Sequence, residues 1–88
     1  MVAVRIEKHE VERLLTALLV QIGGISRETI HPRSSIDSDL QMESVAFLEL
    51  QVALEDELGV ELDPIRIVEL NEFHAISEYI FSLTADSQ

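Results

Sequence analysis

The side chains that could do chemistry in this sequence do not form a recognisable catalytic or metal-binding set. The three histidines, His9, His31 and His74, are scattered and include no i, i+4 pair, so the spacing does not indicate a metal site. The chain has no cysteine, which excludes a disulfide framework, a cysteine zinc site and a thiol nucleophile. There is also no glycine-rich phosphate loop and no G-x-S-x-G turn. We therefore predict that the protein is not an enzyme.

One carboxylate run begins like a calcium-binding loop but does not continue as one. The run from Asp37 to Glu43 starts D-S-D, which resembles the first ligand positions of such a loop. Met42 then stands where the turn requires glycine, and Leu48 stands where the bidentate glutamate is required. The run is therefore not interpreted as a calcium site, and no metal ligand is assigned.

The acidic groups are concentrated in the second part of the chain. Residues 34–88 hold thirteen of the 17 acidic residues and a single basic residue, Arg66, and the net charge of the whole chain is -11. A surface of this sign lacks the basic footprint that nucleic-acid binding requires. It suits partners with basic surfaces, although the same charge would also simply keep a small protein soluble.

Apolar spacing and turn residues predict an all-α fold of four helices, three longer and one short. Between Val4 and Ile22 the apolar residues follow i, i+3, i+4, i+7 spacing, and Gly23-Gly24 ends that helix. Residues 25–40 form a long loop, a second helix covers about 44–58, and Gly59 ends it. Within this helix we expect Val45, Leu48, Ala53, Leu54 and Leu58 to face inward. Asp63-Pro64 begins a short helix over about 65–70, and the last helix covers roughly 74–83.

Length and composition limit the remaining possibilities. With 88 residues, and roughly 100–200 residues in an ordinary domain, we expect one domain over 1–88. Aromatic residues make up 5% of the chain, so the core should be mostly aliphatic. No apolar run reaches the ~20 residues that would span a membrane, and no signal peptide is recognised. The expected location is the cytoplasm.

Two segments together resemble the acyl carrier protein family. Asp39-Leu40 and Ser44-Val45 match its D-L-x-x-D-S-[LV] motif, and Glu55-Asp56-Glu57-Leu58-Gly59-Val60-Glu61-Leu62 matches its E-x-x-[FL]-G-[VI]-x-[IL] motif. The end of the chain, residues 69–80, is similar to the end of that family. The resemblance covers roughly residues 6–83, and it implies a four-helix bundle with a long loop between the first two helices.

The resemblance implies a carrier with a covalent cofactor. Ser44 would bear a 4′-phosphopantetheine arm taken from coenzyme A by a phosphopantetheinyl transferase, and the arm would hold acyl groups as thioesters. A serine at the start of a helix suits a phosphodiester, because free N–H groups and the positive end of the helix dipole lie there. The alternative for Ser44 is an ordinary helix N-cap.

The helix after the serine would be the surface that partner enzymes with basic docking patches recognise. The residues implied in partner binding are Glu43, Val45, Glu49, Val52, Glu55 and Asp56. Alternatively, these carboxylates only solvate the helix and Val52 belongs to the core. The carrier would be a monomer that has no membrane span and no nucleic-acid partner, and it would serve fatty acid, polyketide or related lipid and secondary-metabolite assembly. An aminoacyl or peptidyl carrier, and an unmodified helical adaptor for a basic partner, are the other functions considered.

The chain departs from the family at several positions. Glu43 replaces the aspartate usual before the serine, Met42 replaces a common glycine, and Gln51 is polar where an apolar core residue is usual. His74-Ala75 lacks the usual capping oxygen at the last helix, so Asn71 or a backbone group must substitute. These departures suggest a specialised carrier.

Overall fold

The computed structural model describes the backbone of residues 6–86 and the side chains of residues 6–84. Within this range the chain forms four α-helices and one 3-10 turn, η1 (Arg27–Thr29). The α-helices are α1 (Lys8–Gly23), α2 (Ser44–Leu58), α3 (Pro64–Leu70) and α4 (Phe73–Asp86). The predicted all-α fold with a long loop between the first two helices is confirmed.

The helix boundaries follow local signals that are visible in the sequence. The C-caps of α1 and α2 are Gly24 and Gly59, with φ of 65° and 66°, in the left-handed region that glycine enters without strain. Asp63 caps α3, because its side chain accepts a hydrogen bond from the Ile65 N–H at 3.0 Å. Pro64 follows as the first residue of α3, where a missing N–H costs nothing.

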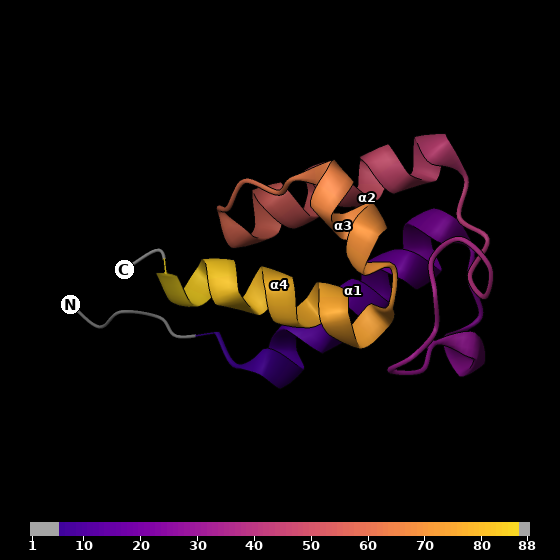
Figure 1. Ribbon diagram of the computed structural model, residues 1–88, viewed down its shortest axis with the longest axis horizontal. Coiled ribbons are helices and arrows are strands. Elements are labelled where there is room, and N and C mark those ends of the chain that lie inside the picture. The colour runs from indigo at the N-terminus through magenta and orange to yellow at the C-terminus, as the bar shows by residue number, and fades with distance from the viewer. Residues whose placement is uncertain (1–5, 87–88) are drawn as a thin grey trace.

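One aliphatic core lies between the helices. α1 packs against both α2 and α4, and α3 packs against α4; Figure 1 shows the short α3 in front of the longer helices. The buried apolar residues are Val11, Leu15, Leu19, Ile25, Leu40, Leu50, Leu54, Leu62, Ile67, Phe73, Ile76 and Ile80. Phe73 is the one aromatic residue among them, so the prediction of a mostly aliphatic core is confirmed within the described residues.

The inward face of α2 differs from our prediction. Val45 and Leu48 were expected to face inward, but they are 67% and 57% exposed. Leu54 is buried as predicted, Leu50 is buried although it was not expected to be, and Phe47 packs against the same core. The prediction was wrong because apolar residues occur on every side of α2, so their spacing does not select one face. The contact with α1 determines which face of α2 is buried.

The long loop is held against the junction of α3 and α4 by backbone bonds. The Phe73 N–H donates to the Ser34 carbonyl at 2.9 Å, and the His74 N–H donates to the Pro32 carbonyl at 2.8 Å. These loop carbonyls satisfy the first amides of α4, which have no partner within the helix. Of the two substitutes expected there, backbone groups therefore serve, and Asn71 does not.

Asn71 instead fixes the loop from the other side. Its side-chain oxygen accepts from the N–H groups of Ile36 and Asp37 at 3.2 and 3.4 Å, and its backbone carbonyl accepts from the Ile36 N–H at 2.9 Å. Asn71 also has a φ of 63°, a conformation that asparagine tolerates better than most residues. The side chain of Asn71 therefore bonds the loop, and its backbone conformation ends α3.

We expect Asn71→Ala to lower the free energy of unfolding by roughly 1–3 kcal/mol, because it removes the side-chain bonds and strains a residue at positive φ. Asn71→Gly should cost less, because glycine adopts positive φ readily. Urea unfolding of the three proteins measures both effects. An Asn71→Ala variant as stable as the wild type would contradict this role.

Candidate functional site

Ser44 is the first residue of α2 and is exposed. The N-cap is the preceding residue, Glu43, whose carbonyl accepts the first helical bond, from the Phe47 N–H at 2.8 Å. Within residues 6–86 the hydroxyl of Ser44 has no hydrogen-bond partner. The alternative interpretation of Ser44 as an ordinary N-cap is therefore wrong, and its hydroxyl is free for modification.

The start of α2 is electrostatically suited to an anion. The N–H groups of Ser44, Val45 and Ala46 precede the first helical donor and have no acceptor among the described residues. The carboxylate of Glu43 makes no capping bond to them, and the first turn contains no acidic residue. Free donors and the positive end of the helix dipole therefore lie beside the Ser44 hydroxyl. A phosphate ester on that oxygen would be stabilised there.

An open groove begins at Ser44 and runs between α2 and α3. Its volume is about 330 Å³, and it is lined by Ile36, Asp37, Met42, Ser44, Phe47, Leu48, Val68 and Asn71. Most of these side chains are apolar. Asp37 is the charged exception, and hydrogen bonds with Asn71 and Ser38 hold the pKa of its carboxyl below the usual range. An apolar chain attached through Ser44 would find this groove directly beside it.

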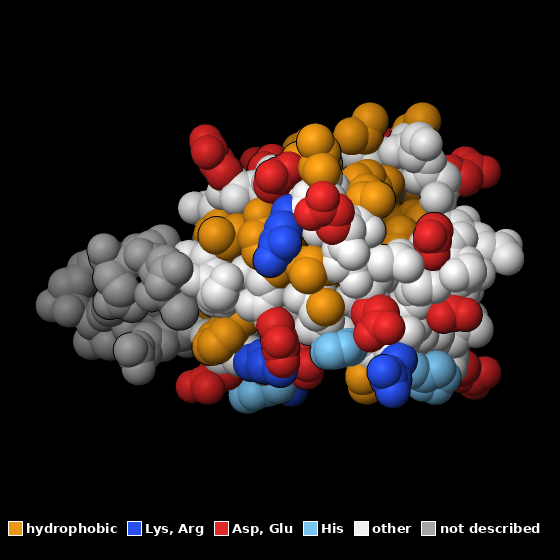
Figure 2. All heavy atoms as spheres, viewed as in Figure 1, with side chains coloured by type: hydrophobic (Ala, Val, Ile, Leu, Met, Phe, Trp, Pro, Cys, Tyr) orange, Lys and Arg blue, Asp and Glu red, His pale blue; other side chains and the backbone are white. Residues whose placement is uncertain are grey.

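Apolar side chains are exposed next to the groove. The large exposed ones among the described residues are Val45, Leu48, Val52, Ile65 and Val68, each at least 57% exposed, and all lie on α2 or α3. We call these five residues the α2–α3 patch. Figure 2 shows hydrophobic side chains gathered over these two helices. Exposed apolar side chains that gather on one face of a protein often mark an interaction site.

The α2–α3 patch includes residues that our sequence prediction missed. The resemblance implied exposed contacts at Val45 and Val52, whereas apolar spacing had placed Val45 inward. Both are exposed, so the inward assignment of Val45 and the alternative that Val52 belongs to the core are wrong. Leu48 was assigned to the core, while Ile65 and Val68 were not considered. The spacing of Ile65 and Val68 relative to Ile67, which is buried, could have indicated that they lie on another face of α3. In a helix of seven residues such spacing is weak evidence.

The acidic residues of α2 do not all have the same surroundings. Glu43, Glu49 and Asp56 are exposed. Glu55 is half-buried, and its Oε2 accepts from the Leu62 N–H at 2.8 Å. Glu55 therefore helps to hold the segment that leads to α3, in addition to any contact with a partner.

Crowded carboxylates should make the protein sensitive to salt. Residues 43–63 contain seven acidic residues and no basic one, so their mutual repulsion opposes folding and is weakened by dissolved ions. We expect the melting temperature to rise with moderate sodium chloride, and further with a magnesium salt. The rise should be smaller in the double variant Glu57→Gln, Glu61→Gln. A melting temperature that does not change with salt would contradict this.

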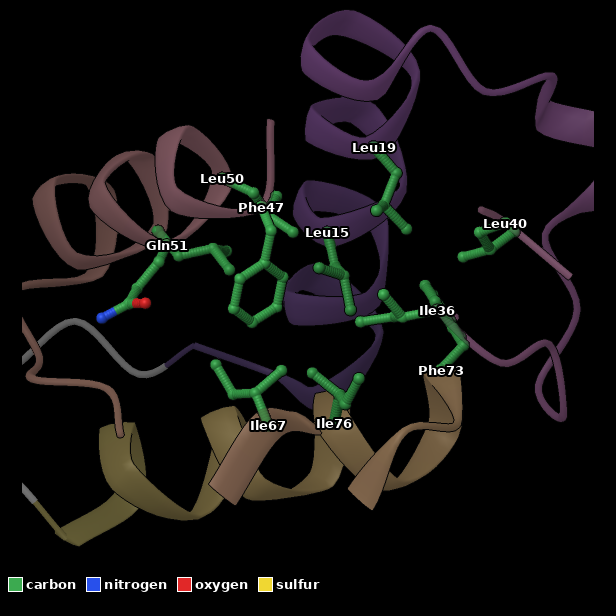
Figure 3. A pocket seen from close by; sticks show the side chains of 11 residues that line it. Leu15, Leu19, Ile36, Leu40, Phe47, Leu50, Gln51, Ile67, Phe73 and Ile76 are labelled. Carbon is green, nitrogen blue, oxygen red and sulfur yellow. The ribbon is translucent and has the colours of Figure 1, made fainter. Parts of the chain in front are cut away.

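A second, narrow cavity lies inside the core (Figure 3). Its volume is about 10 Å³, and its lining comes from all four helices and the long loop. This is at the lower limit of the space that one water molecule needs. An acyl chain could enter this core only if side chains moved.

The structure is a small four-helix bundle that presents an exposed serine at the start of α2. The sequence profile of the phosphopantetheine attachment site family matches residues 13–80, which is well over half of the chain. The protein belongs to this family, whose members are carriers and not catalysts. The cofactor and the non-enzymatic role predicted from the resemblance are thereby confirmed.

The chain is also similar to proteins named acyl carrier protein. It is 24% identical to that of Acidothermus cellulolyticus over 82 residues, covering 93% of this chain and 98% of the relative. It is 27% identical to that of Thermobifida fusca, covering 75% and 84%. It is 36% identical to that of Nitratidesulfovibrio vulgaris over 53 residues, covering 60% and 70%. No helix among residues 6–86 is long and apolar enough to cross a membrane.

Proposed function

We propose that Ser44 is the attachment serine and that the protein is an acyl carrier. The observation that supports this most directly is the exposed, unbonded hydroxyl of Ser44, beside free N–H groups and an apolar groove. The relatives named acyl carrier protein, at 24% to 36% identity, favour acyl cargo over aminoacyl cargo. Fatty acid, polyketide or related lipid and secondary-metabolite assembly are the pathways proposed. A cytoplasmic location and a monomeric state stay predictions.

In this proposal the residues of the chain position the cofactor, and they take no part in the reactions of its thiol. The first-turn N–H groups of α2 would hold the phosphate, and Met42, Leu48 and Val68 would contact the arm or its cargo along the groove. When bound, phosphopantetheine supplies a terminal thiol that holds an acyl group as a thioester. The serine has no base close in the sequence, so a separate phosphopantetheinyl transferase supplies the attachment chemistry.

The surface around Ser44 is proposed to dock partner enzymes with basic patches. Glu43, Glu49 and Asp56 supply exposed negative charge, and Val45 and Val52 supply exposed apolar contacts. Glu55 contributes its charge while it also binds Leu62. Docking through exposed charges is fast and salt-sensitive, which suits a carrier that visits several enzymes.

The test is modification in vitro. The purified protein is incubated with coenzyme A and a broad-specificity phosphopantetheinyl transferase, and its intact mass is measured. We expect a gain of one phosphopantetheine, located by peptide mapping on the segment that contains Ser44. A folded helical protein that gains nothing, while a known carrier in the same tube is modified, would contradict the proposal and favour an unmodified adaptor.

A further inference from the structure

One positive charge stands apart in the acidic part of the molecule. Residues 34–88 contain thirteen acidic residues and no Lys or Arg other than Arg66. Arg66 lies on α3, directly after Ile65 and two residues before Val68, and both of these belong to the α2–α3 patch. In Figure 2 a blue side chain lies beside α3 among orange and red ones, whereas the other visible blue side chains lie along the lower edge. Arg66 therefore interrupts an otherwise acidic and apolar surface.

The guanidinium of Arg66 is available to a partner. Its Nη1 lies 3.9 Å from the Oε1 of Glu69, and both side chains are more than half exposed. This distance is too long for a hydrogen bond, and an exposed ion pair of this kind stabilises the fold little. Within residues 6–84 the guanidinium donates no hydrogen bond. Its N–H donors are therefore free to bind a group outside the chain.

A partner enzyme that receives the arm from Ser44 has to approach this face. Leu48 and Val68 belong both to the α2–α3 patch and to the groove that begins at Ser44. The patch continues from Val68 to Ile65, which is 68% exposed, and the two lie on the same side of α3 because they are three residues apart. Since Arg66 follows Ile65 directly, a surface that covers this side of α3 also reaches the long side chain of Arg66.

We propose that Arg66 selects among partner enzymes. A docking surface that is basic throughout is attracted by the carboxylates of α2 but meets a like charge at α3, and burial of an unpaired guanidinium is costly. A partner with basic residues opposite α2 and a carboxylate opposite Arg66 avoids both costs, because a guanidinium binds a carboxylate through two parallel hydrogen bonds. This inference rests on the proposed function, and it specifies the partner as a protein whose docking surface carries both signs in that arrangement.

The first experiment measures the repulsion. The probe is a phosphopantetheinyl transferase of known structure whose carrier-binding surface is basic throughout, and kcat/KM for modification of the protein is followed by intact mass. We expect Arg66→Gln to raise kcat/KM by roughly 3- to 10-fold and Arg66→Glu to raise it further. About 0.5 M sodium chloride should remove most of this difference.

The matched controls are Arg13→Gln and Arg13→Glu, which change the net charge by the same amounts. Arg13 is exposed on α1, outside the α2–α3 patch. These variants should change kcat/KM by less than about twofold, because the charge that they alter does not face the partner. They separate a local effect of Arg66 from the effect of net charge.

The second experiment measures the attraction. A photo-cross-linking amino acid is placed at position 66, and mass spectrometry identifies the transferase residue that it reaches. That transferase residue is then replaced by glutamate. With this altered transferase the order should reverse, so that the wild type is modified roughly 3- to 10-fold faster than Arg66→Glu.

Circular dichroism checks that each variant is folded, as expected for substitutions at exposed positions. Equal changes in kcat/KM at Arg66 and Arg13 would overturn the proposal. So would an order that does not reverse, or the absence of a cross-link from position 66 while one forms from the position of Val45. A wild-type protein that is not modified at all, while a known carrier in the same tube is, would instead overturn the proposed function itself.

Discussion

The Ser44→Ala variant is expected to gain no phosphopantetheine and to unfold at the same urea concentration as the wild type. The loss of modification is complete, because alanine has no oxygen to form the phosphodiester. Stability should stay within about 0.5 kcal/mol, because Ser44 is exposed and its hydroxyl bonds to nothing among the described residues. Intact mass and urea unfolding measure the two effects separately.

The matched control for Ser44→Ala is Ser26→Ala. Ser26 is also an exposed serine in front of a helical turn, and its side chain makes no capping bond. This variant should be modified like the wild type. Modification of Ser44→Ala would show that another serine is the attachment site, and a large loss of stability would show that Ser44 has a structural role.

The second large effect is expected at Leu54, which is 1% exposed in the centre of the core. Leu54→Ala should lower the free energy of unfolding by roughly 2.5–5 kcal/mol, through lost burial and the cavity left behind. A domain of this size has about 5–15 kcal/mol in total, so the variant should lose a large share of its stability and unfold at a clearly lower temperature. Urea and thermal unfolding followed by circular dichroism measure the change.

Leu48→Ala is the control for Leu54→Ala, with the same chemical change on the same helix. Leu48 is 57% exposed, so its truncation should cost within about 0.5 kcal/mol. The sequence alone predicted both leucines to be buried, and the pair therefore tests the inward face of α2 directly. Equal losses in the two variants would contradict the structure.

The helix boundaries were predictable because their signals are local. Gly24 and Gly59 adopt positive φ, and Asp63-Pro64 forms a helix start with the expected side-chain bond. Such residues act on their immediate neighbours and need no knowledge of the rest of the fold. The exposed position of Ser44 at the start of α2 was predictable for the same reason.

The features that were not predictable arise between distant parts of the chain. Asn71 accepts a hydrogen bond from the N–H of Ile36, which lies 35 residues away, and no local sequence pattern connects the two. The α2–α3 patch depends on how a seven-residue helix is placed. The polar character of Gln51 was noted from the sequence, but its unpartnered oxygen follows only from the packing around it.

The position of Asn71 has a mechanical consequence. It is the C-cap of α3, and it bonds the backbone of Ile36, one of the two residues that line both the groove and the core cavity. These hydrogen bonds therefore connect the loop segment at Ile36 with the end of α3. If the core widens on this side, the loop segment and the end of α3 must move together, or the hydrogen bonds between Asn71 and Ile36 must break. Asn71 shares this task with Phe73 and His74, whose N–H groups donate to loop carbonyls, so the loop that leads to Ser44 is coupled to the α3–α4 junction by bonds that lie away from the serine itself.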